Sequence, residues 1–295
     1  MRDAVATPRT LADLLAAAAV LLECGGAVGK GRREAAALWA VVAGVTPGDV
    51  WLRRDDPPTP DLIAPFQRAI ERRAGGAPFA YAVERIGFRT LDLRIDPRAL
   101  IPRPETEGLV ELVLQECRAR FGEGGAAADI GTGSGCIALS LAVAGTFERV
   151  VAVERSPAAA ALARENLARV RPRVPVDIRQ GDLLDPLGDT RFRVIVANPP
   201  YLTTAEFDAL DRAVRDFEPR EALVSGPDGL DATRAILAGA AAHLEPDGFL
   251  ALEIDERRAG AVCALAESAG WERAVTRDDL FGRARYALVF PREGA

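Results

Sequence analysis

The stretch Asp129-Ile130-Gly131-Thr132-Gly133-Ser134-Gly135 lies where a short apolar run passes into a helical pattern. Glycines at such a turn let the backbone adopt positive φ and let a ligand approach the main chain closely. The dinucleotide fingerprint would need glycine at position 136, which is Cys136, and a phosphate-binding P-loop would need Gly-Lys followed by Ser or Thr. The pattern therefore predicts either a ligand site or a plain tight turn between a strand and a helix.

Strand and helix patterns alternate on both sides of this turn. Strands are expected to end near residue 130 and to cover 149–153, 174–178, 193–197 and 248–254, with helices at 136–143, 157–169, 231–243 and 257–268. The alternation predicts a Rossmann-like α/β fold with a doubly wound, largely parallel sheet. The last two strands, 271–276 and 285–290, have no helix between them, so one of them is expected to be antiparallel.

The N-terminal part of the chain has a different pattern. Residues 10–24, 32–42 and 61–73 show helical spacing and are separated by Gly- and Pro-bearing turns. Residues 11–22 resemble a signal-peptide core, but Asp13 interrupts the run and suits a capping pair with Thr10. We therefore predict a small helical domain over 1–76, an interdomain hairpin and linker over 77–103, and the α/β domain over 104–295.

Composition narrows the class of protein. The 295-residue chain has a net charge of −6 and a pI of about 5.1, which argues against binding nucleic acid through phosphates. Four scattered cysteines without a CxxC pair fit a reducing cytosol. His243 is the only histidine, which argues against a metal site built on several histidines. With no stretch long enough to span a membrane, we expect a cytoplasmic, metal-free protein, and nothing calls for more than a monomer.

Acids follow two further strand ends. Glu154 ends the second strand, where a carboxylate suits a bidentate contact to ribose hydroxyls. Asp182 follows the third strand and can accept a hydrogen bond from an adenine amino group. Taken singly, Glu154 would more often be a solvated strand end and Asp182 a turn residue. Together with the glycine turn they predict a nucleoside site without phosphate chemistry, as for S-adenosylmethionine.

The fourth strand end is Asn198-Pro199-Pro200-Tyr201, directly after the aliphatic run Val194–Ala197. The two prolines fix φ and hold a rigid turn at the edge of the sheet where α/β proteins bind ligands. A Pro-stiffened loop without a ligand is the plain alternative.

This turn suits the transfer of a methyl group to a planar nitrogen. S-adenosylmethionine is already an activated methyl donor, so the reaction needs positioning more than acid–base groups. The Asn198 side-chain oxygen and the Pro199 carbonyl can accept both N–H bonds of a planar NH2 group, which turns its lone pair toward the methyl. Tyr201 would pack on the flat face of that group. The turn selects the kind of nitrogen and leaves its source open.

Arg103 lies between two prolines on the predicted domain boundary. Pro104 followed by Glu105 suits the first turn of a helix, which is enough to explain the segment. Arg103 is also well placed to face a cleft, and we predict that it contacts the substrate.

With these motifs the sequence resembles the HemK/PrmC-type N5-glutamine methyltransferases, which modify the glutamine of the Gly-Gly-Gln motif in class 1 peptide chain release factors. The resemblance covers nearly the whole chain. Its segments are Arg72–Pro78 with Tyr81, Leu100–Glu107, Asp129–Gly135, Asn198–Tyr201, Phe217–Pro219 with Ala222-Leu223, Gly226 with Asp228–Asp231, and Arg285–Val289. Asn-Pro-Pro-Tyr is shared with adenine and guanine amino-methyltransferases, whereas Pro102–Glu107 is far more selective. Related enzymes that act on a ribosomal-protein glutamine have Pro-Arg-Ser-Pro at that point.

The resemblance implies a class I S-adenosylmethionine-dependent methyltransferase, with S-adenosylhomocysteine as the product. The residues that would hold the cofactor are Gly131, Thr132, Gly133, Ser134, Gly135, Glu154, Asp182, Leu183 and Asn198. The glutamine would be bound by Asn198, Pro199, Pro200, Tyr201 and Arg103, of which Asn198, Pro199 and Tyr201 are the catalytic residues. The helical domain and the loop 203–230 would grip a release factor, without direct contact to nucleic acid. Methylation of adenine or guanine in nucleic acid, methylation of a ribosomal-protein glutamine, and a catalytically idle adaptor remain open alternatives.

The sequence departs from the family pattern at three positions. Glu84 stands where the family usually has glycine, which bears on the interdomain hairpin. Glu154 replaces the commoner Asp, and its extra methylene shifts the carboxylate but keeps the role. Leu183 occupies a place that can be aromatic, so stacking on adenine is expected to be weaker.

Overall fold

The computed structural model describes residues 9–26 and 29–292 and divides into two compact units. The first unit ends at Arg85 and also takes in Arg212–Phe217. The second unit consists of Ile86–Asp211 and the chain from Glu218 onward. In this region the two units meet at one boundary in the chain, between Arg85 and Ile86. The three-part division at residues 76 and 103 stays a prediction.

The first unit is helical. Its helices are α1 (Leu11–Cys24), α2 (Gly31–Ala43), α3 (Pro47–Leu52), α4 (Pro60–Ala74), α5 (Phe79–Val83) and α10 (Arg212–Arg215). Helices α1 to α5 enclose a core in which the Trp39 ring meets the Phe66 ring edge-on, with 5.2 Å between centroids. Burial of aromatic side chains of this size supplies much of the stability of so small a unit.

Helix α1 confirms the predicted cap and amphipathic spacing. Thr10 Oγ1 accepts a hydrogen bond from the Asp13 backbone N–H, and Asp13 Oδ2 accepts one from the Thr10 N–H. Both donor–acceptor distances are 3.1 Å. Such a cap stabilises a helix by about 1 kcal/mol. Leu14 and Leu22 are buried, as expected for the apolar face of this helix. Leu21 is 54% exposed, so the buried face is narrower than the apolar run 11–22 suggests.

Glu84 ends helix α5 in the left-handed region, with φ of 53° and ψ of 34°. This backbone conformation favours glycine, because a Cβ atom crowds the neighbouring carbonyl. The Glu84 carboxylate forms an ion pair with Arg72 at 2.8 Å. Glu84 therefore performs the helix-ending role of a glycine at a conformational cost, beside a cation of its own unit.

The second unit is built on a seven-stranded sheet with the strand order β5-β4-β3-β6-β7-β9-β8. Its strands are β3 (Ala126–Ile130), β4 (Arg149–Glu154), β5 (Val176–Gln180), β6 (Phe192–Ala197), β7 (Leu244–Glu253), β8 (Arg273–Asp278) and β9 (Ala284–Phe290). Strands β3 to β7 are parallel, and β9 is antiparallel to both neighbours. The predicted doubly wound sheet with an antiparallel last strand is confirmed. A separate hairpin pairs β1 (Arg85–Phe88) with β2 (Leu91–Arg94).

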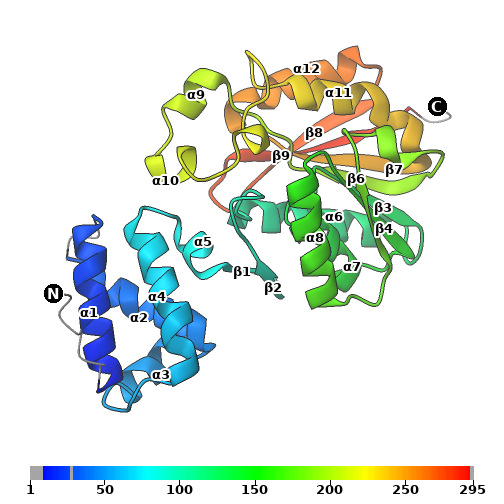
Figure 1. Ribbon diagram of the computed structural model, residues 1–295. Coiled ribbons are helices and arrows are strands. Elements are labelled where there is room, and N and C mark those ends of the chain that lie inside the picture. The colour runs from blue at the N-terminus through cyan, green and yellow to red at the C-terminus, as the bar shows by residue number, and fades with distance from the viewer. Residues whose placement is uncertain (1–8, 27–28, 293–295) are drawn as a thin grey trace. The chain divides into compact units, whose positions relative to one another are not determined.

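Helices cover both faces of the sheet. Helices α6 (Pro104–Arg120), α7 (Cys136–Ala144) and α8 (Pro157–Val170) pack on one face, and α11 (Asp231–Gly239) and α12 (Ala259–Ser268) pack on the other (Figure 1). The central strands are buried on both faces, which explains why Val194–Ala197 is a continuous apolar run rather than an alternating one. The carboxyl ends of β3, β4, β5 and β6 thus meet at one edge of this sheet.

The connections differ in detail from the expectation. The long loop before Leu230 contains helix α9 (Thr204–Asp208), helix α10 and the 3-10 turn η2 (Arg220–Ala222). The predicted helix 231–243 ends as an α-helix at Gly239 and continues as the 3-10 segment η3 (Ala240–His243). Short 3-10 segments η1 (Asp185–Leu187) and η4 (Glu256–Arg258) complete the unit. Short polar helices lack the apolar periodicity by which longer helices are found in a sequence.

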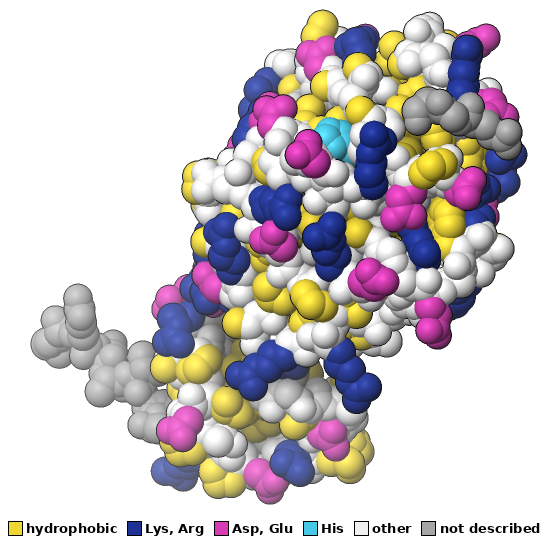
Figure 2. Space-filling model, turned by 90° about the vertical axis from the view of Figure 1, so that its right-hand side faces the viewer, with side chains coloured by type: hydrophobic (Ala, Val, Ile, Leu, Met, Phe, Trp, Pro, Cys, Tyr) yellow, Lys and Arg dark blue, Asp and Glu magenta, His cyan; other side chains and the backbone are white. Residues whose placement is uncertain are grey.

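The surface carries mixed charges. On the face drawn in Figure 2, Lys and Arg side chains are interspersed with Asp and Glu side chains. Within residues 9–26 and 29–292, no helix combines the length and the apolar character that a membrane span needs.

Gly108 in helix α6 offers a test of the packing between α6 and β9. A Cβ atom at this position would lie 2.1 Å from the Tyr286 hydroxyl oxygen, and that hydroxyl donates a hydrogen bond to the Glu105 carbonyl at 2.8 Å. We expect Gly108→Ala to lower the free energy of unfolding by about 1–3 kcal/mol, because overpacking outweighs the gain in helix propensity. Urea denaturation of the purified variant measures this change.

A matched control is Gly260→Ala in helix α12. A Cβ atom there would meet nothing within 4 Å, so the substitution should stabilise by up to about 1 kcal/mol through helix propensity alone. If both substitutions raised the urea midpoint equally, the close approach of Tyr286 to helix α6 would be wrong.

Candidate active site

A cavity of about 440 Å³ opens at the carboxyl ends of strands β3, β4, β5 and β6. It is lined by most of the residues singled out in the sequence, namely Arg103, Gly131, Thr132, Gly133, Ser134, Glu154, Asp182, Leu183, Asn198, Pro199 and Pro200. Gly135 and Tyr201 are not among the lining residues. Four separate strand ends therefore contribute to one site.

The glycine turn after β3 needs its glycines for conformation. Gly131, Gly133 and Gly135 have φ values of 74°, 56° and 85°, all in the left-handed region. A Cβ atom on Gly131 would meet nothing within 4 Å, so its main chain is open to a ligand. Gly135 has another role, because a Cβ atom there would lie 3.3 Å from Leu139 and 3.5 Å from Ala163. It allows close packing of the turn against helices α7 and α8.

Asp129 holds the glycine turn from beneath. Its buried Oδ2 accepts a hydrogen bond from the Thr132 hydroxyl at 2.6 Å and another from the Ala138 N–H at 3.0 Å. Burial raises the pKa of the Asp129 carboxyl to about 7, although both hydrogen bonds act in the opposite direction. The turn is thus fixed before any ligand binds.

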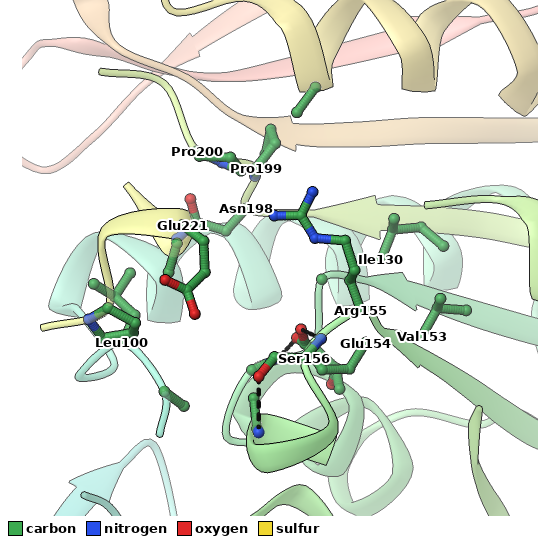
Figure 3. Close-up of a pocket in the computed structure, with 18 of the residues that line it drawn as sticks. Leu100, Ile130, Val153, Glu154, Arg155, Ser156, Asn198, Pro199, Pro200 and Glu221 are labelled. Carbon is green, nitrogen blue, oxygen red and sulfur yellow. Dashed lines mark hydrogen bonds between the residues drawn. The ribbon is translucent and has the colours of Figure 1, made fainter. Parts of the chain in front are cut away.

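Glu154 connects the glycine turn to the start of helix α8. Its Oε2 accepts from the Gly133 N–H and its Oε1 from the Ser156 N–H, each at 2.8 Å, and Figure 3 shows the second of these bonds. A carboxylate oxygen has two lone pairs, so each oxygen can accept one further hydrogen bond. Glu154 is therefore held rigidly and still has acceptors that a ligand in the cavity can use.

Asp182 and Leu183 follow strand β5 and both line the cavity. Leu183 has a φ of 42°, a left-handed value that is uncommon for a branched side chain. Strained backbone of this kind persists only where the surrounding structure enforces it, and it concentrates at ligand sites. The predicted contacts of these two residues with adenine stay predictions.

The Asn198 turn brings an amide to the cavity. Asn198, Pro199 and Pro200 lie across the cavity from Glu154 (Figure 3). The Asn198 side-chain nitrogen donates a hydrogen bond to the Thr106 hydroxyl at 3.1 Å. The turn is pinned on its far side, because the backbone N–H groups of Tyr201 and Leu202 both donate to the Leu223 carbonyl, at 3.2 and 2.8 Å.

Tyr201, the last residue of the Asn198 turn, is partly buried. It lies outside the cavity lining, and burial followed by the charge of Glu253 raises the pKa of its hydroxyl to about 12. Its contact with an acceptor group stays a prediction.

Arg103 is engaged by an acid that sequence reasoning missed. Its guanidinium lies 2.5 Å from Oε1 of Glu218, and Oε2 of Glu218 accepts from the Ile101 N–H at 3.1 Å. Glu218 is only 4% exposed, so the pair holds the segment before helix α6 against the segment before η2. The Phe217-Glu218-Pro219 match to the family was the available signal. A substrate contact of Arg103 stays a prediction.

Three further polar residues were also missed. Thr106 links Asn198 to the buried Glu253, whose Oε2 accepts the Thr106 hydroxyl hydrogen at 2.7 Å. Asn166 is fully buried and donates to the Ser134 carbonyl at 2.8 Å, which supports the glycine turn. Thr106 lies in the quoted Pro102–Glu107 segment, whereas nothing in the sequence distinguishes Glu253 or Asn166 from exposed residues of the same type.

Among the described residues no cluster of three or more His, Cys, Asp or Glu could hold a metal ion.

Each of the two units contains a region that matches a known protein family. A family model described as the PrmC N-terminal domain matches residues 12–83, and one described as the methyltransferase small domain matches residues 108–218. Among solved structures, a methyltransferase from Pyrococcus furiosus has a TM-score of 0.51 at 21% identity, covering 69% of this chain and 90% of that one. The hMettl16 catalytic domain has a TM-score of 0.57 at 14% identity, covering 86% and 90%. These two similarities show the methyltransferase fold alone.

Curated relatives are similar over nearly their full length. A release factor glutamine methyltransferase from Moorella thermoacetica is 41% identical over 285 residues, which is 96% of this chain and 99% of the relative. Proteins of the same name from Deinococcus radiodurans and Cereibacter sphaeroides are 40% and 39% identical, covering 94% and 93% of this chain and 96% of each relative. The chain belongs to the family of release factor glutamine methyltransferases, as the resemblance of its motifs predicted.

Proposed function

We propose that this protein transfers the methyl group of S-adenosylmethionine to the side-chain amide nitrogen of the Gly-Gly-Gln glutamine in class 1 release factors. Membership of the family supports the reaction and the substrate. The observation that carries the mechanism is that the Asn198 turn lines the same cavity as the glycine turn and Glu154. A donor site and an acceptor site for a planar nitrogen are thus adjacent.

The residues of the cavity fit the cofactor. The open main chain at Gly131 and the second lone pairs of the Glu154 oxygens suit a nucleoside, with Glu154 on the ribose hydroxyls and Asp182 on the adenine amino group. Leu183 would contact the adenine ring. When bound, the cofactor supplies a methyl group already activated on a sulfonium sulfur. The products of the transfer are the methylated amide, S-adenosylhomocysteine and the proton that the amide nitrogen loses to solvent.

The Asn198 turn orients the acceptor. Since the Asn198 nitrogen is occupied by Thr106, the side-chain oxygen is the atom left to accept an N–H of the glutamine amide. The Pro199 carbonyl accepts the other N–H, and Tyr201 contacts the flat face. These two hydrogen bonds hold the amide group so that the lone pair of its nitrogen points toward the methyl group. The two acceptor oxygens also offset the positive charge that develops on the nitrogen. The reaction therefore needs no general base to begin.

A protein is a better substrate for this surface than nucleic acid. The net charge of −6 and the interspersed charges in Figure 2 differ from the basic stripe that phosphate binding requires. We propose that the helical unit and the loop 203–230 bind the protein substrate. Because release factors take part in translation, we propose that the protein acts in the cytoplasm, and that it does so as a monomer.

Labelled methyl transfer separates the candidate substrates. The wild-type protein is incubated with labelled S-adenosylmethionine and with purified release factor, ribosomal protein, RNA or DNA in parallel. Label on the release factor that disappears when its Gly-Gly-Gln glutamine is replaced by glutamate supports the proposal. Label confined to nucleic acid or to the ribosomal protein would overturn it.

A further inference from the structure

Glu253 is a buried acid at the carboxyl end of strand β7, and it does not line the cavity. It is 2% exposed and is not among the residues that line the cavity, whereas Thr106, its hydrogen-bond partner, is. The chain of contacts runs from Asn198 Nδ2 to Thr106 Oγ1 at 3.1 Å and from Thr106 Oγ1 to Glu253 Oε2 at 2.7 Å. A buried acid is thus connected to the catalytic turn by one hydroxyl.

The direction of this chain follows from its chemistry. An ionised carboxylate can only accept hydrogen bonds, so the single hydrogen of the Thr106 hydroxyl goes to Glu253. The hydroxyl oxygen then has only lone pairs to offer to Asn198, which must present its NH2 group. The two polar atoms of an amide point apart, so the Asn198 oxygen is directed away from Thr106.

We propose that Glu253 is a positioning residue that acts through Thr106 to fix the Asn198 amide with its oxygen toward the acceptor N–H group. This inference rests on the proposed function of the Asn198 turn. Protonated Glu253 would instead donate to Thr106, whose hydrogen would then turn to Asn198 and favour the flipped amide. An NH2 group would face the NH2 group of the substrate, and two donors cannot bond. The orientation of the amide is therefore set by the charge of Glu253.

The charge of Glu253 changes near neutral pH. Burial raises its pKa to about 7, while the hydrogen bond from Thr106 and the charge of Arg285 lower it. The titratable and charged groups that act on it or feel its charge are Arg103 and Glu105 at the start of α6, Arg285 and Tyr286 on β9, Tyr201 after the turn, and Cys136 at the start of α7. Methyl transfer should accordingly increase as pH rises through about 7.

Stability should change in the opposite direction. The folded pKa of Glu253 lies above its ordinary value of 4.5, so its contribution to the free energy of unfolding is full below about pH 4.5 and is lost as pH rises through about 7. The ionised state that orients Asn198 is thus the less stable state of the fold. Such opposition between stability and activity is typical of a functional group and is not expected of a structural one.

The first test compares pH profiles of single-turnover methyl transfer for the wild type, Glu253→Gln and Glu245→Gln. The side-chain oxygen of glutamine can accept the Thr106 hydrogen at every pH, so Glu253→Gln should lose the acid limb centred at about 7. Glu245 lies at the other end of β7 and pairs with Arg193, so its variant should keep the limb. Asp129 titrates near the same pH but is present in all three proteins, so the difference belongs to Glu253.

The second test removes and restores the hydroxyl. Thr106→Val should lower the single-turnover rate by about 10–100-fold, since the amide loses its orientation, and Thr106→Ser should regain most of that loss. Cofactor affinity is measured for each variant by calorimetry, which shows whether the fold and the donor site are intact. A valine variant at the wild-type rate, or a serine variant as slow as valine, would overturn the proposal.

The two levels of inference fail differently. A wild type that places no label on the release factor counts against the proposed function. A wild type that is active, with an acid limb that Glu253→Gln retains unchanged, counts against the role of Glu253.

Discussion

Replacing Asn198 by alanine should lower the rate of methyl transfer by about 10²–10³-fold, the loss typical of removing one preorganised polar group from a reacting centre. The side chain supplies the oxygen that accepts one N–H of the glutamine amide, and nothing else at this turn replaces it. Cofactor affinity should change little, because the glycine turn and Glu154 are held by their own hydrogen bonds, which do not involve Asn198.

The measurement pairs single-turnover methyl transfer to release factor with calorimetric titration of S-adenosylmethionine. Asn198→Asp is the informative companion, because it keeps the shape but cannot donate to Thr106, whose hydrogen already goes to Glu253. We expect it to be as slow as alanine. An alanine variant with the wild-type rate would remove Asn198 from the mechanism.

Replacing Glu154 by glutamine should weaken cofactor binding by about 10–100-fold. Hydrogen bonds to a charged group contribute about 1.5–3 kcal/mol each, and every 1.4 kcal/mol is a factor of about ten in affinity. Glutamine would place an NH2 group against the N–H of Gly133 or Ser156, both of which need an acceptor. The substitution therefore disturbs the glycine turn and also removes a ribose contact.

Glu148→Gln is the matched control for this experiment. Glu148 is exposed and immediately precedes the same strand, β4, at the end away from the cavity. Its variant should bind S-adenosylmethionine as the wild type does. Equal affinities for the Glu154 and Glu148 variants would show that the cofactor is held elsewhere.

Much of the fold could be predicted because its signals are local. The helical cap at Thr10, the glycine turn and the aliphatic run before Asn198 each lie within a few residues, and the structure confirms all three elements. The order of strands and helices follows from periodicity, and the antiparallel strand β9 follows from the missing crossover helix.

The supporting residues of the site could not be predicted because their partners are far apart in the sequence. Thr106 and Glu253 are separated by 147 positions, and Arg103 and Glu218 by 115. An acid at the end of a strand looks the same in a sequence whether it is exposed or 2% exposed like Glu253. Tyr201 is not among the residues that line the cavity, and its predicted contact with the acceptor group stays a prediction.

The departures from the family pattern are partly explained by backbone conformation. Glu84 and Leu183 both have positive φ, at 53° and 42°. At Glu84 this accounts for a preference for glycine, which adopts such a conformation without steric cost. At Leu183 the main chain rather than the side chain is the unusual feature. Glu154 accepts two backbone hydrogen bonds, and its contact with the ribose stays a prediction.

Tandem mass spectrometry of release factor methylated by the purified protein tests the central claim most directly, because it locates the methyl group on one atom. The cavity, with its turn for a planar NH2 group beside a nucleoside site, predicts a single methyl on the side-chain amide nitrogen of the Gly-Gly-Gln glutamine, and no methylation when that residue is glutamate. A methyl group on any other residue or atom, or equal labelling of the glutamate variant, would contradict it.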